Sequence, residues 1–310
     1  MRLNRKFQRG FTLIEMIVVM VITGILGGII AIFINGPVQG YVDSARRAEM
    51  NDIADTAMSR ITRDLRTALP NSVRIWGATS GTGSCNGTEA CYLEYLETTA
   101  GGLYNTATST DCFSSTTLGV GCTALTATTT TGNLVIGAGS ATLNGGAITF
   151  GTSRVVVDNL YNNSLGDCSD SNPSAYCAIG TGGAVGSGGA PVITGVTGTN
   201  ADFTIAFLSH TFTGSPSNHF QIVSQPVTYV CDPVAGTLTR YWGYSIQGTQ
   251  PNTVATLNGL TGEQNAKLAS NVSACSFAYN QPLSLLTMLS ITESGETMTL
   301  YNIAHVSNIP

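Results

Sequence analysis

Residues 11–34 read FTLIEMIVVMVITGILGGIIAIFI, and this stretch decides the fold. Its 24 residues contain only three polar side chains, which are Thr12, Glu15 and Thr23. A helix needs about 20 predominantly apolar residues to cross the hydrocarbon core of a membrane. The stretch is therefore predicted to be a membrane-spanning helix.

The residues before this stretch carry a cluster of positive charge. Its members are Arg2, Arg5, Lys6 and Arg9. The next basic residue along the chain is Arg46. Because basic residues beside a span stay on the cytoplasmic side, we expect residues 1–10 to be a cytoplasmic leader. The chain after the span is then expected to lie across the membrane.

An ordinary secretory signal peptide does not fit this pattern. Such a peptide has an apolar core of about 7–15 residues, followed by a cleavage site with small residues. Here the apolar run is longer, and the small residue Gly10 precedes it. We expect the leader to be removed and the apolar helix to be kept.

Residues 9–15, Arg-Gly-Phe-Thr-Leu-Ile-Glu, resemble the type IV prepilin signature of a basic residue, Gly, Phe, Thr, Leu, any residue and Glu. The resemblance implies that a prepilin peptidase cleaves between Gly10 and Phe11 on the cytoplasmic side, and that Phe11 is then N-methylated. It also implies that the helix is first an anchor in membrane lipid and later part of a filament core, packed with the major pilin and other minor pilins.

Glu15 needs a partner for its charge. An acidic side chain inside a span costs about 2.5–3.5 kcal/mol on insertion scales. No Lys, Arg or His lies between Glu15 and Arg46, so the expected partner is the new α-amine of Phe11 or that of a neighbouring subunit. A one-step stagger between parallel helices would place Glu15 against the next subunit's amine, where low dielectric strengthens the attraction. We therefore predict that Glu15 acts in subunit assembly.

The helix is expected to continue beyond the membrane as far as Pro70. Residues 11–36 form its transmembrane half, and residues 37–70 form its amphipathic periplasmic half. Apolar residues recur at helical spacing on one face, at Met50, Ala54, Ala57, Ile61, Leu65 and Ala68. Charged residues occupy the opposite face, at Asp52, Asp55, Arg63 and Arg66. Such a pattern predicts a helix with one face against a folded body.

The body, residues 71–310, has short apolar runs bounded by Gly, Asn, Ser and Thr, which is typical of β-strands. The expected strands cover residues 92–97, 133–136, 154–160, 202–208, 220–231, 237–244, 285–292 and 297–306. The last four are expected to form two hairpins, with turns at 232–236 and 294–295. One long helix packed on one antiparallel sheet is the economical arrangement, and it gives an α+β fold.

Residues 98–200 are rich in Thr, Ser and Gly. The run at residues 180–198 is typical of irregular loop. We expect the whole stretch to be a stapled, surface-exposed elaboration of the body without a large core of its own. Whether it forms a second lobe is left open.

The chain has eight cysteines with loop-like spacings and no Cys-x-x-Cys pair. This pattern indicates disulfides formed outside the cytoplasm. Pairing of neighbours would join Cys85 with Cys91, Cys112 with Cys122, Cys168 with Cys177, and Cys231 with Cys275. Other connectivities remain open.

Four segments near the C-terminus resemble minor pilins of the mannose-sensitive haemagglutinin (MSHA) pilus. They are residues 225–232, 238–240, 271–277 and 305–310. Residues 59–70 are similar to the same group and to minor pseudopilins of type II secretion. The resemblance implies a type IV pilin-like fold and a minor pilin that primes assembly on the inner-membrane platform, at or near the filament tip. It further implies a single-pass inner-membrane protein with a periplasmic body, later carried on the extracellular pilus of a Gram-negative bacterium.

The charge distribution argues against nucleic-acid binding. The chain has 13 basic and 18 acidic residues, and residues 1–70 hold nine of the basic and six of the acidic ones. The body is left with four basic and twelve acidic residues, a net charge of −8. It lacks the positive surface that neutralises phosphates.

We expect no enzyme activity, no cofactor and no metal site. No Gly-x-Ser-x-Gly elbow precedes a helical pattern, and the only histidines are His210, His219 and His305. His210 and His219 are nine residues apart, which is not the helical spacing of a zinc site. Asp167 and Asp170 lack the full ligand pattern of a calcium loop.

The sequence therefore favours a structural and interaction protein. Two other functions stay open, a pseudopilin of type II secretion and an adhesin whose contact surface is residues 98–200. Four aromatic residues are candidates for a carbohydrate-binding surface, namely Trp76, Tyr241, Trp242 and Tyr244. We favour their alternative use, in the core or at a subunit interface.

Overall fold

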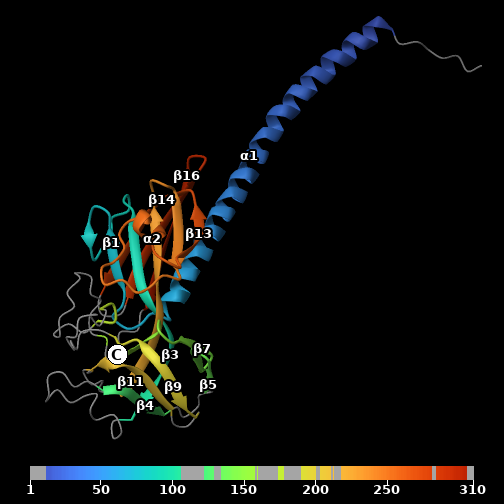
Figure 1. Ribbon diagram of the computed structural model, residues 1–310. Coiled ribbons are helices and arrows are strands. Elements are labelled where there is room, and N and C mark those ends of the chain that lie inside the picture. The colour runs from blue at the N-terminus through green and yellow to red at the C-terminus, as the bar shows by residue number, and fades with distance from the viewer. Residues whose placement is uncertain are drawn as a thin grey trace, which may run out of the picture. The chain divides into compact units, whose positions relative to one another are not determined.

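The computed structural model describes residues 12–105, 122–128, 134–157, 159, 174–177, 190–199, 203–210, 212, 218–280 and 284–305. The chain divides into two compact units, residues 1–50 and residues 51–310. Figure 1 shows the long helix in blue and the strands of the body from cyan to red.

The helix α1 (Leu13–Leu65) begins at a polar cap. The backbone N–H of Glu15 donates a hydrogen bond of 3.4 Å to Thr12 Oγ1, which is the bond that an N-cap residue makes. The large apolar side chains from Leu13 to Ile34 are exposed. The helix is long and apolar enough to cross a membrane, so this exposed apolar surface fits membrane anchoring.

The part of α1 that belongs to the second unit is amphipathic, as predicted. Ala54, Ala57, Ile61 and Leu65 are buried. The charged residues predicted for the opposite face are exposed, at Asp52, Asp55, Arg63 and Arg66.

The predicted helix end at Pro70 is wrong, since α1 ends at Leu65. The N–H groups of Arg66 and Thr67 still bond to carbonyls three residues back, but the N–H of Leu69 donates to Leu96 O at 2.8 Å. The N–H of Thr98 donates to Thr67 O at 2.8 Å. Pairing with a strand therefore ends the helix before the proline does.

The largest sheet contains ten strands, all paired antiparallel. Its main path runs through β13 (Gln264–Ser270), β12 (Thr237–Trp242), β11 (His219–Asp232), β3 (Cys91–Tyr104), β4 (Cys122–Thr128), β10 (Phe203–His210) and β9 (Ile193–Gly198). Three short strands join it at the side, namely β1 (Arg74–Gly77), β2 (Gly81–Thr82) and β8 (Arg154–Val156). The long strands β3 and β11 pair with each other and extend through the body.

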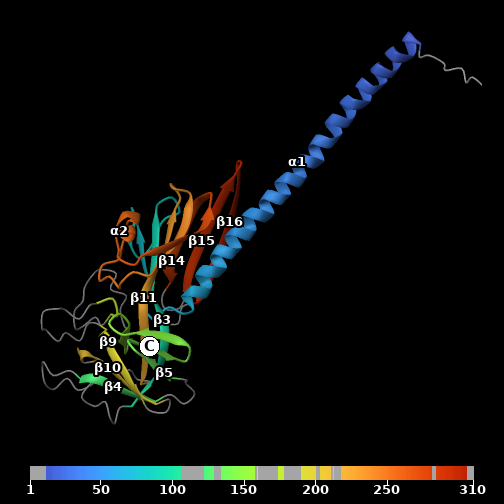
Figure 2. The same cartoon turned by 45° about the vertical axis from the view of Figure 1, so that its right-hand side comes forward.

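Two further sheets of three strands complete the described body, together with the short helix α2 (Val254–Asn258). One consists of β14 (Val272–Asn280), β15 (Ser284–Glu293) and β16 (Glu296–His305). The other consists of β5 (Leu134–Gly137), β6 (Ser140–Leu143) and β7 (Gly146–Thr149). In Figures 1 and 2, the strands β14–β16 lie at one end of the body, and β4, β9 and β10 lie at the other.

The expectation of one sheet is therefore wrong. The chain leaves the large sheet at Asn271, which lies between β13 and β14 and has a positive φ of 58°. A left-handed residue turns the chain sharply, and asparagine tolerates this conformation better than most residues. The new direction starts a separate sheet.

The predicted strands and hairpins agree well with the structure. The hairpin of β15 and β16 turns at Ser294 and Gly295, both with positive φ, as a two-residue hairpin turn requires. The hairpin of β11 and β12 turns at residues 233–236, where Asp232 Oδ1 accepts hydrogen bonds from the N–H groups of Val234 and Ala235.

Described residues from 98–200 take part in a large core that they share with other parts of the body, so the prediction of a surface-exposed stretch is wrong. The core includes Ala141, Leu143, Ile148, Val155 and Ile193 from this stretch. It is shared with later residues on β10 and β11, including Phe203, Ile205, Phe220 and Ile222. The described residues of this stretch thus pack against strands β10 and β11 of the body.

The structure contains the predicted disulfides Cys85–Cys91 and Cys231–Cys275. Cys91 and Cys231 lie directly opposite each other on β3 and β11, so the two bridges are neighbours. Cys177 is disulfide-bonded as well. Its predicted partner, Cys168, and the predicted partner of Cys122, Cys112, lie outside the described residues.

Candidate assembly site and buried networks

The candidate assembly site is the start of α1. Glu15 lies in the first turn of the helix, and its neighbours Leu13, Ile14, Met16 and Ile17 are exposed. The leader residues Arg2, Arg5, Lys6 and Arg9 lie outside the described residues, as do Gly10 and Phe11. Among the predicted site residues of this segment, only Glu15 can be placed.

The position of Glu15 favours a negative charge. A helix N-terminus carries a partial positive charge from its unpaired N–H groups, which attracts a carboxylate in the first turn. From Glu15 to Arg46 the helix contains no basic side chain. A positive charge supplied from outside the helix is therefore the partner that the Glu15 carboxylate can take.

A polar network holds the last turn of α1 to the body. Asp64 Oδ2 accepts hydrogen bonds from the Tyr229 hydroxyl and from Arg240 Nε, both at 2.8 Å. Asp64 Oδ1 forms an ion pair of 2.9 Å with Arg60. Burial raises the pKa of Tyr229, and the Asp64 charge raises it further, so the tyrosine stays a neutral donor.

The same helix segment also bonds to β16. The side-chain amide of Asn302 donates to Thr62 Oγ1 at 3.1 Å. With Tyr229 on β11 and Arg240 on β12, this contact places residues 51–65 of α1 against both the largest sheet and the sheet of β14–β16. The helix thus joins two sheets that the chain builds separately.

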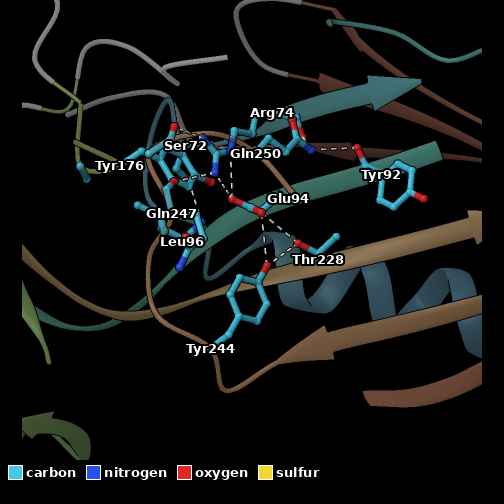
Figure 3. A network of polar contacts seen from close by, with 12 residues as sticks. Ser72, Arg74, Tyr92, Glu94, Leu96, Tyr176, Thr228, Tyr244, Gln247 and Gln250 are labelled. Carbon is cyan, nitrogen blue, oxygen red and sulfur yellow. Dashed lines mark hydrogen bonds and ion pairs between the residues drawn. The ribbon is translucent and has the colours of Figure 1, made fainter. Parts of the chain in front are cut away.

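A second network lies inside the body, around Glu94 of β3 (Figure 3). Arg74 and Glu94 form a fully buried ion pair, in which Arg74 Nε lies 2.9 Å from Glu94 Oε1. The other oxygen of Glu94 accepts from the hydroxyls of Thr228 and Tyr244, at 3.1 and 3.2 Å. Arg74 also donates to the carbonyls of Gln247 and Gly248. Both charges are satisfied, as a buried pair requires.

This network reaches residues 174–177 through Tyr176. The guanidinium of Arg74 stacks on the Tyr176 ring, 3.6 Å from its centroid. The Tyr176 hydroxyl donates to Ser72 O at 2.8 Å, and Figure 3 shows this tyrosine beside Arg74. Asn159 adds a second link, because it accepts from the N–H of Ala175 and donates to Pro70 O. The segment before Cys177 is therefore fixed to the chain that follows α1.

Most of the aromatic candidates belong to the core. Tyr241 and Tyr244 are buried in a cluster with Leu257, and Trp76 packs against that cluster. The guanidinium of Arg240 stacks on Trp242, 4.8 Å from the ring centroid. The interpretation of these four residues as an open sugar-binding face is therefore wrong, and the core alternative describes them.

The histidines do not come together in the described part of the chain. His210 is buried beside the Phe212 ring, with 4.7 Å between centroids, whereas His219 is exposed at the start of β11. Among the described residues, no group of three His, Cys, Asp or Glu side chains is arranged to hold a metal ion. Asp167 and Asp170 lie outside these residues.

The buried hydrogen-bond and ion-pair partners of Asp64 and Glu94 were not predicted from the sequence. A signal for Glu94 exists, since it is a lone charge within the apolar run Cys-Tyr-Leu-Glu-Tyr-Leu at residues 91–96. A charged residue in a buried strand needs a partner of opposite charge. The identity of that partner depends on the sheet and is not local information.

Comparison with known proteins identifies one motif. Residues 5–31 match the prokaryotic N-terminal methylation motif. Neither the curated proteins nor the solved structures contain a match to the chain. The matched residues cover the leader from Arg5 onward, the predicted cleavage point and most of the apolar stretch.

Proposed function

We propose that this type IV pilin-like chain is a minor pilin of an MSHA-type pilus that primes filament assembly at or near the tip and supports surface adhesion. The observation that carries the proposal is the N-terminal methylation motif at the start of an exposed apolar helix. The motif supports a type IV pilin-like protein and implies processing by a prepilin peptidase and assembly with other pilins. The long helix, antiparallel sheets and two disulfides fit a pilin-like α+β fold.

Processing creates the group that Glu15 requires. Cleavage after Gly10 would leave the α-amine of Phe11 next to the capped start of α1. Two unit charges 4 Å apart attract by about 4 kcal/mol at an effective dielectric constant of 20. A neighbouring subunit in a staggered bundle would supply such an amine to Glu15. A subunit that keeps this carboxylate can pair it with the α-amine of another subunit. We therefore propose that this protein is not the only subunit that caps the filament.

The narrower assignment rests on resemblance. The C-terminal segments resemble the O-type minor pilin of the MSHA pilus, MshO. The first three fall on β11, on β12 and at β14, and the last begins at His305, where β16 ends. Under this proposal the chain waits in the inner membrane with its body in the periplasm. The assembly platform then moves it into the extracellular pilus. The protein carries no catalytic activity of its own.

Filament counts test the assembly role. Surface filaments are counted by electron microscopy on a strain that lacks the gene and on the same strain with the gene restored. We expect filaments to vanish and to return with the gene. Filaments that persist without the gene would show that the protein does not prime assembly.

A pseudopilin of type II secretion is the second candidate. Residues 59–70, which include the last turn of α1 and Asp64, resemble that group as well as the pilus group. Release of exoproteins, scored in the same cultures, separates the two systems. Lost secretion with intact filaments would replace the pilus assignment.

A further inference from the structure

The body contains an open cavity of about 800 Å³, lined in part by residues 98–200, the stretch that the adhesin alternative would use. Four parts of the body line it, together with Val192: the middle of β3, the region from β7 to β8, the middle of β11 and the chain after β12. Its size lies within the range of about 300–1,000 Å³ that is usual for sites of small ligands. All four parts belong to the same compact unit.

Glycines set two walls of this cavity. A Cβ atom on Gly146 would lie 1.7 Å from Thr99 O, so only glycine lets β7 approach β3 this closely. Gly243 and Gly262 have positive φ, and a Cβ atom on either would lie within 2.8 Å of the other's carbonyl oxygen. The walls are therefore fixed by contacts between backbones, which makes the cavity part of the fold.

The lining is about equally polar and apolar and is rich in hydroxyl groups. The hydroxyl residues are Thr98, Thr99, Thr149, Thr152, Ser224, Ser245 and Thr261. Thr98 Oγ1 is buried and has no hydrogen-bond partner within the described protein. Glu97 also lines the cavity, where its carboxylate accepts from Gln225 Nε2 at 3.2 Å. Polar groups of this kind suit a ligand that both donates and accepts hydrogen bonds.

Arg154 brings a positive charge to the cavity, and Glu97 brings a negative one. The body has four basic residues, of which Arg74 and Arg240 have carboxylate partners and Lys267 is exposed. Arg154 is half-buried, and through Nη1 it donates to the carbonyls of Ala175 and Cys177. Burial lowers the pKa of Arg154, and within the described part of the chain no carboxylate forms an ion pair with it. A desolvated guanidinium of this kind favours an anionic ligand, above all a carboxylate.

We propose that this cavity binds an acidic sugar residue of the uronic acid class. Arg154 takes the sugar carboxylate, while Glu97 and Gln225 bond to its hydroxyl groups. A sugar fits the lining better than an acidic peptide does, because among the described residues the large apolar side chains in the lining are Val192, Ile246 and the ring of Tyr244, and a ring face suits a sugar. The inference does not rest on the assembly role, since it concerns the folded body alone.

Isothermal titration of the full chain in detergent micelles tests this inference, with trigalacturonic acid as the probe. The matched control ligand is its methyl ester, which keeps the shape and hydroxyls but lacks the charges. We expect the acid to bind and the ester to bind at least about tenfold more weakly, as for a lost charge-assisted hydrogen bond. Equal binding of both, or no binding of the acid, would overturn the proposal.

Two variants locate the site. Arg154→Gln removes the charge, and we expect about a tenfold loss of affinity for the acid. Arg154 also holds residues 174–177, so its substitution changes more than the cavity. Ala147→Trp is therefore a second variant, in which a large side chain at an exposed lining position fills the cavity. Ala235→Trp, at the exposed turn after β11, is the control and should bind like the unmodified chain. Undiminished binding by Ala147→Trp would show that the sugar binds elsewhere.

Discussion

Asp64 in the last turn of α1 and Arg240 in β12 form an ion pair of 2.8 Å, although 176 positions separate them in the sequence. Their side chains are 9% and 10% exposed, so the pair is nearly removed from water. The Asp64 charge raises the pKa of Arg240, against the opposing effect of burial. The pair therefore fixes the end of the helix on the sheet.

We predict that Asp64→Asn destabilises the body by about 3 kcal/mol, because Arg240 is left as a nearly buried charge without a partner. Urea unfolding of the full chain in detergent measures this loss. Asp55→Asn is the control, since Asp55 is exposed on the same helix, and its cost should stay below about 0.5 kcal/mol. Equal costs for the two variants would mean that the ion pair does not hold the helix.

The buried pair of Arg74 and Glu94 gives a second prediction. Glu94→Gln should cost about 3–5 kcal/mol, since it leaves the Arg74 charge buried and uncompensated. The double variant Arg74→Met and Glu94→Leu removes both charges and should cost clearly less than the sum of the two single variants. The measurement is urea unfolding. If the losses of unfolding free energy were additive, the two charges drawn in contact in Figure 3 would not be coupled.

Local patterns in the sequence predict α1 and eight of the sixteen described strands, because helix and strand periods place apolar residues on one face. The spacing of Ala54, Ala57, Ile61 and Leu65 gives the buried face of the helix directly. The turn at Ser294 and Gly295 can also be predicted from the sequence, since few residue pairs adopt positive φ together.

The division into three sheets and the buried partners could not be predicted in the same way. Arg240 meets Asp64, and Thr228 meets Glu94, only after strands far apart in sequence have paired. The core around Val155 and Ile193 was missed for a related reason. Its apolar residues lie in short runs separated by stretches rich in Thr and Gly, and the packing of these runs against one another is not local information.

We predict that the stability of the folded body depends on pH through the carboxyl group of Glu89. Burial raises the pKa of Glu89, but hydrogen bonds from the Ser80 hydroxyl and from the N–H groups of Asn86, Thr79 and Ser80 outweigh it and lower the pKa from 4.5 to about 2. Between these values the folded chain binds fewer protons than the unfolded chain. The contribution of Glu89 is therefore complete above about 4.5 and is lost as the pH falls towards 2.

Comparison with Glu89→Gln measures this contribution. At pH 7 we expect the unmodified chain to be the more stable of the two in urea, and the difference should shrink as the pH is lowered from 5 to 3. Thr88→Val, at the exposed neighbouring position, should keep the pH dependence of the unmodified chain. A difference that stays constant over this range would refute the role of the Glu89 carboxylate.

Glu15 gives the prediction that tests assembly most directly. Glu15→Ala removes the carboxylate that we expect to meet the α-amine of a neighbouring subunit, an attraction of about 4 kcal/mol in a setting of intermediate dielectric constant. The variant should be processed and stay in the membrane, because the apolar helix is unchanged. Its amount in sheared filaments, measured by immunoblot against the membrane fraction, should fall about tenfold or more.

Thr23→Ala is the matched control for Glu15→Ala. It also removes a polar side chain from the apolar helix, but the Thr23 hydroxyl bonds to the carbonyls of Val19 and Met20 within the same helix. We therefore expect normal amounts of this variant in filaments. If Glu15→Ala entered filaments as well as Thr23→Ala, the carboxylate would have no part in assembly. The exposed apolar surface of α1 alone would then have to account for subunit packing.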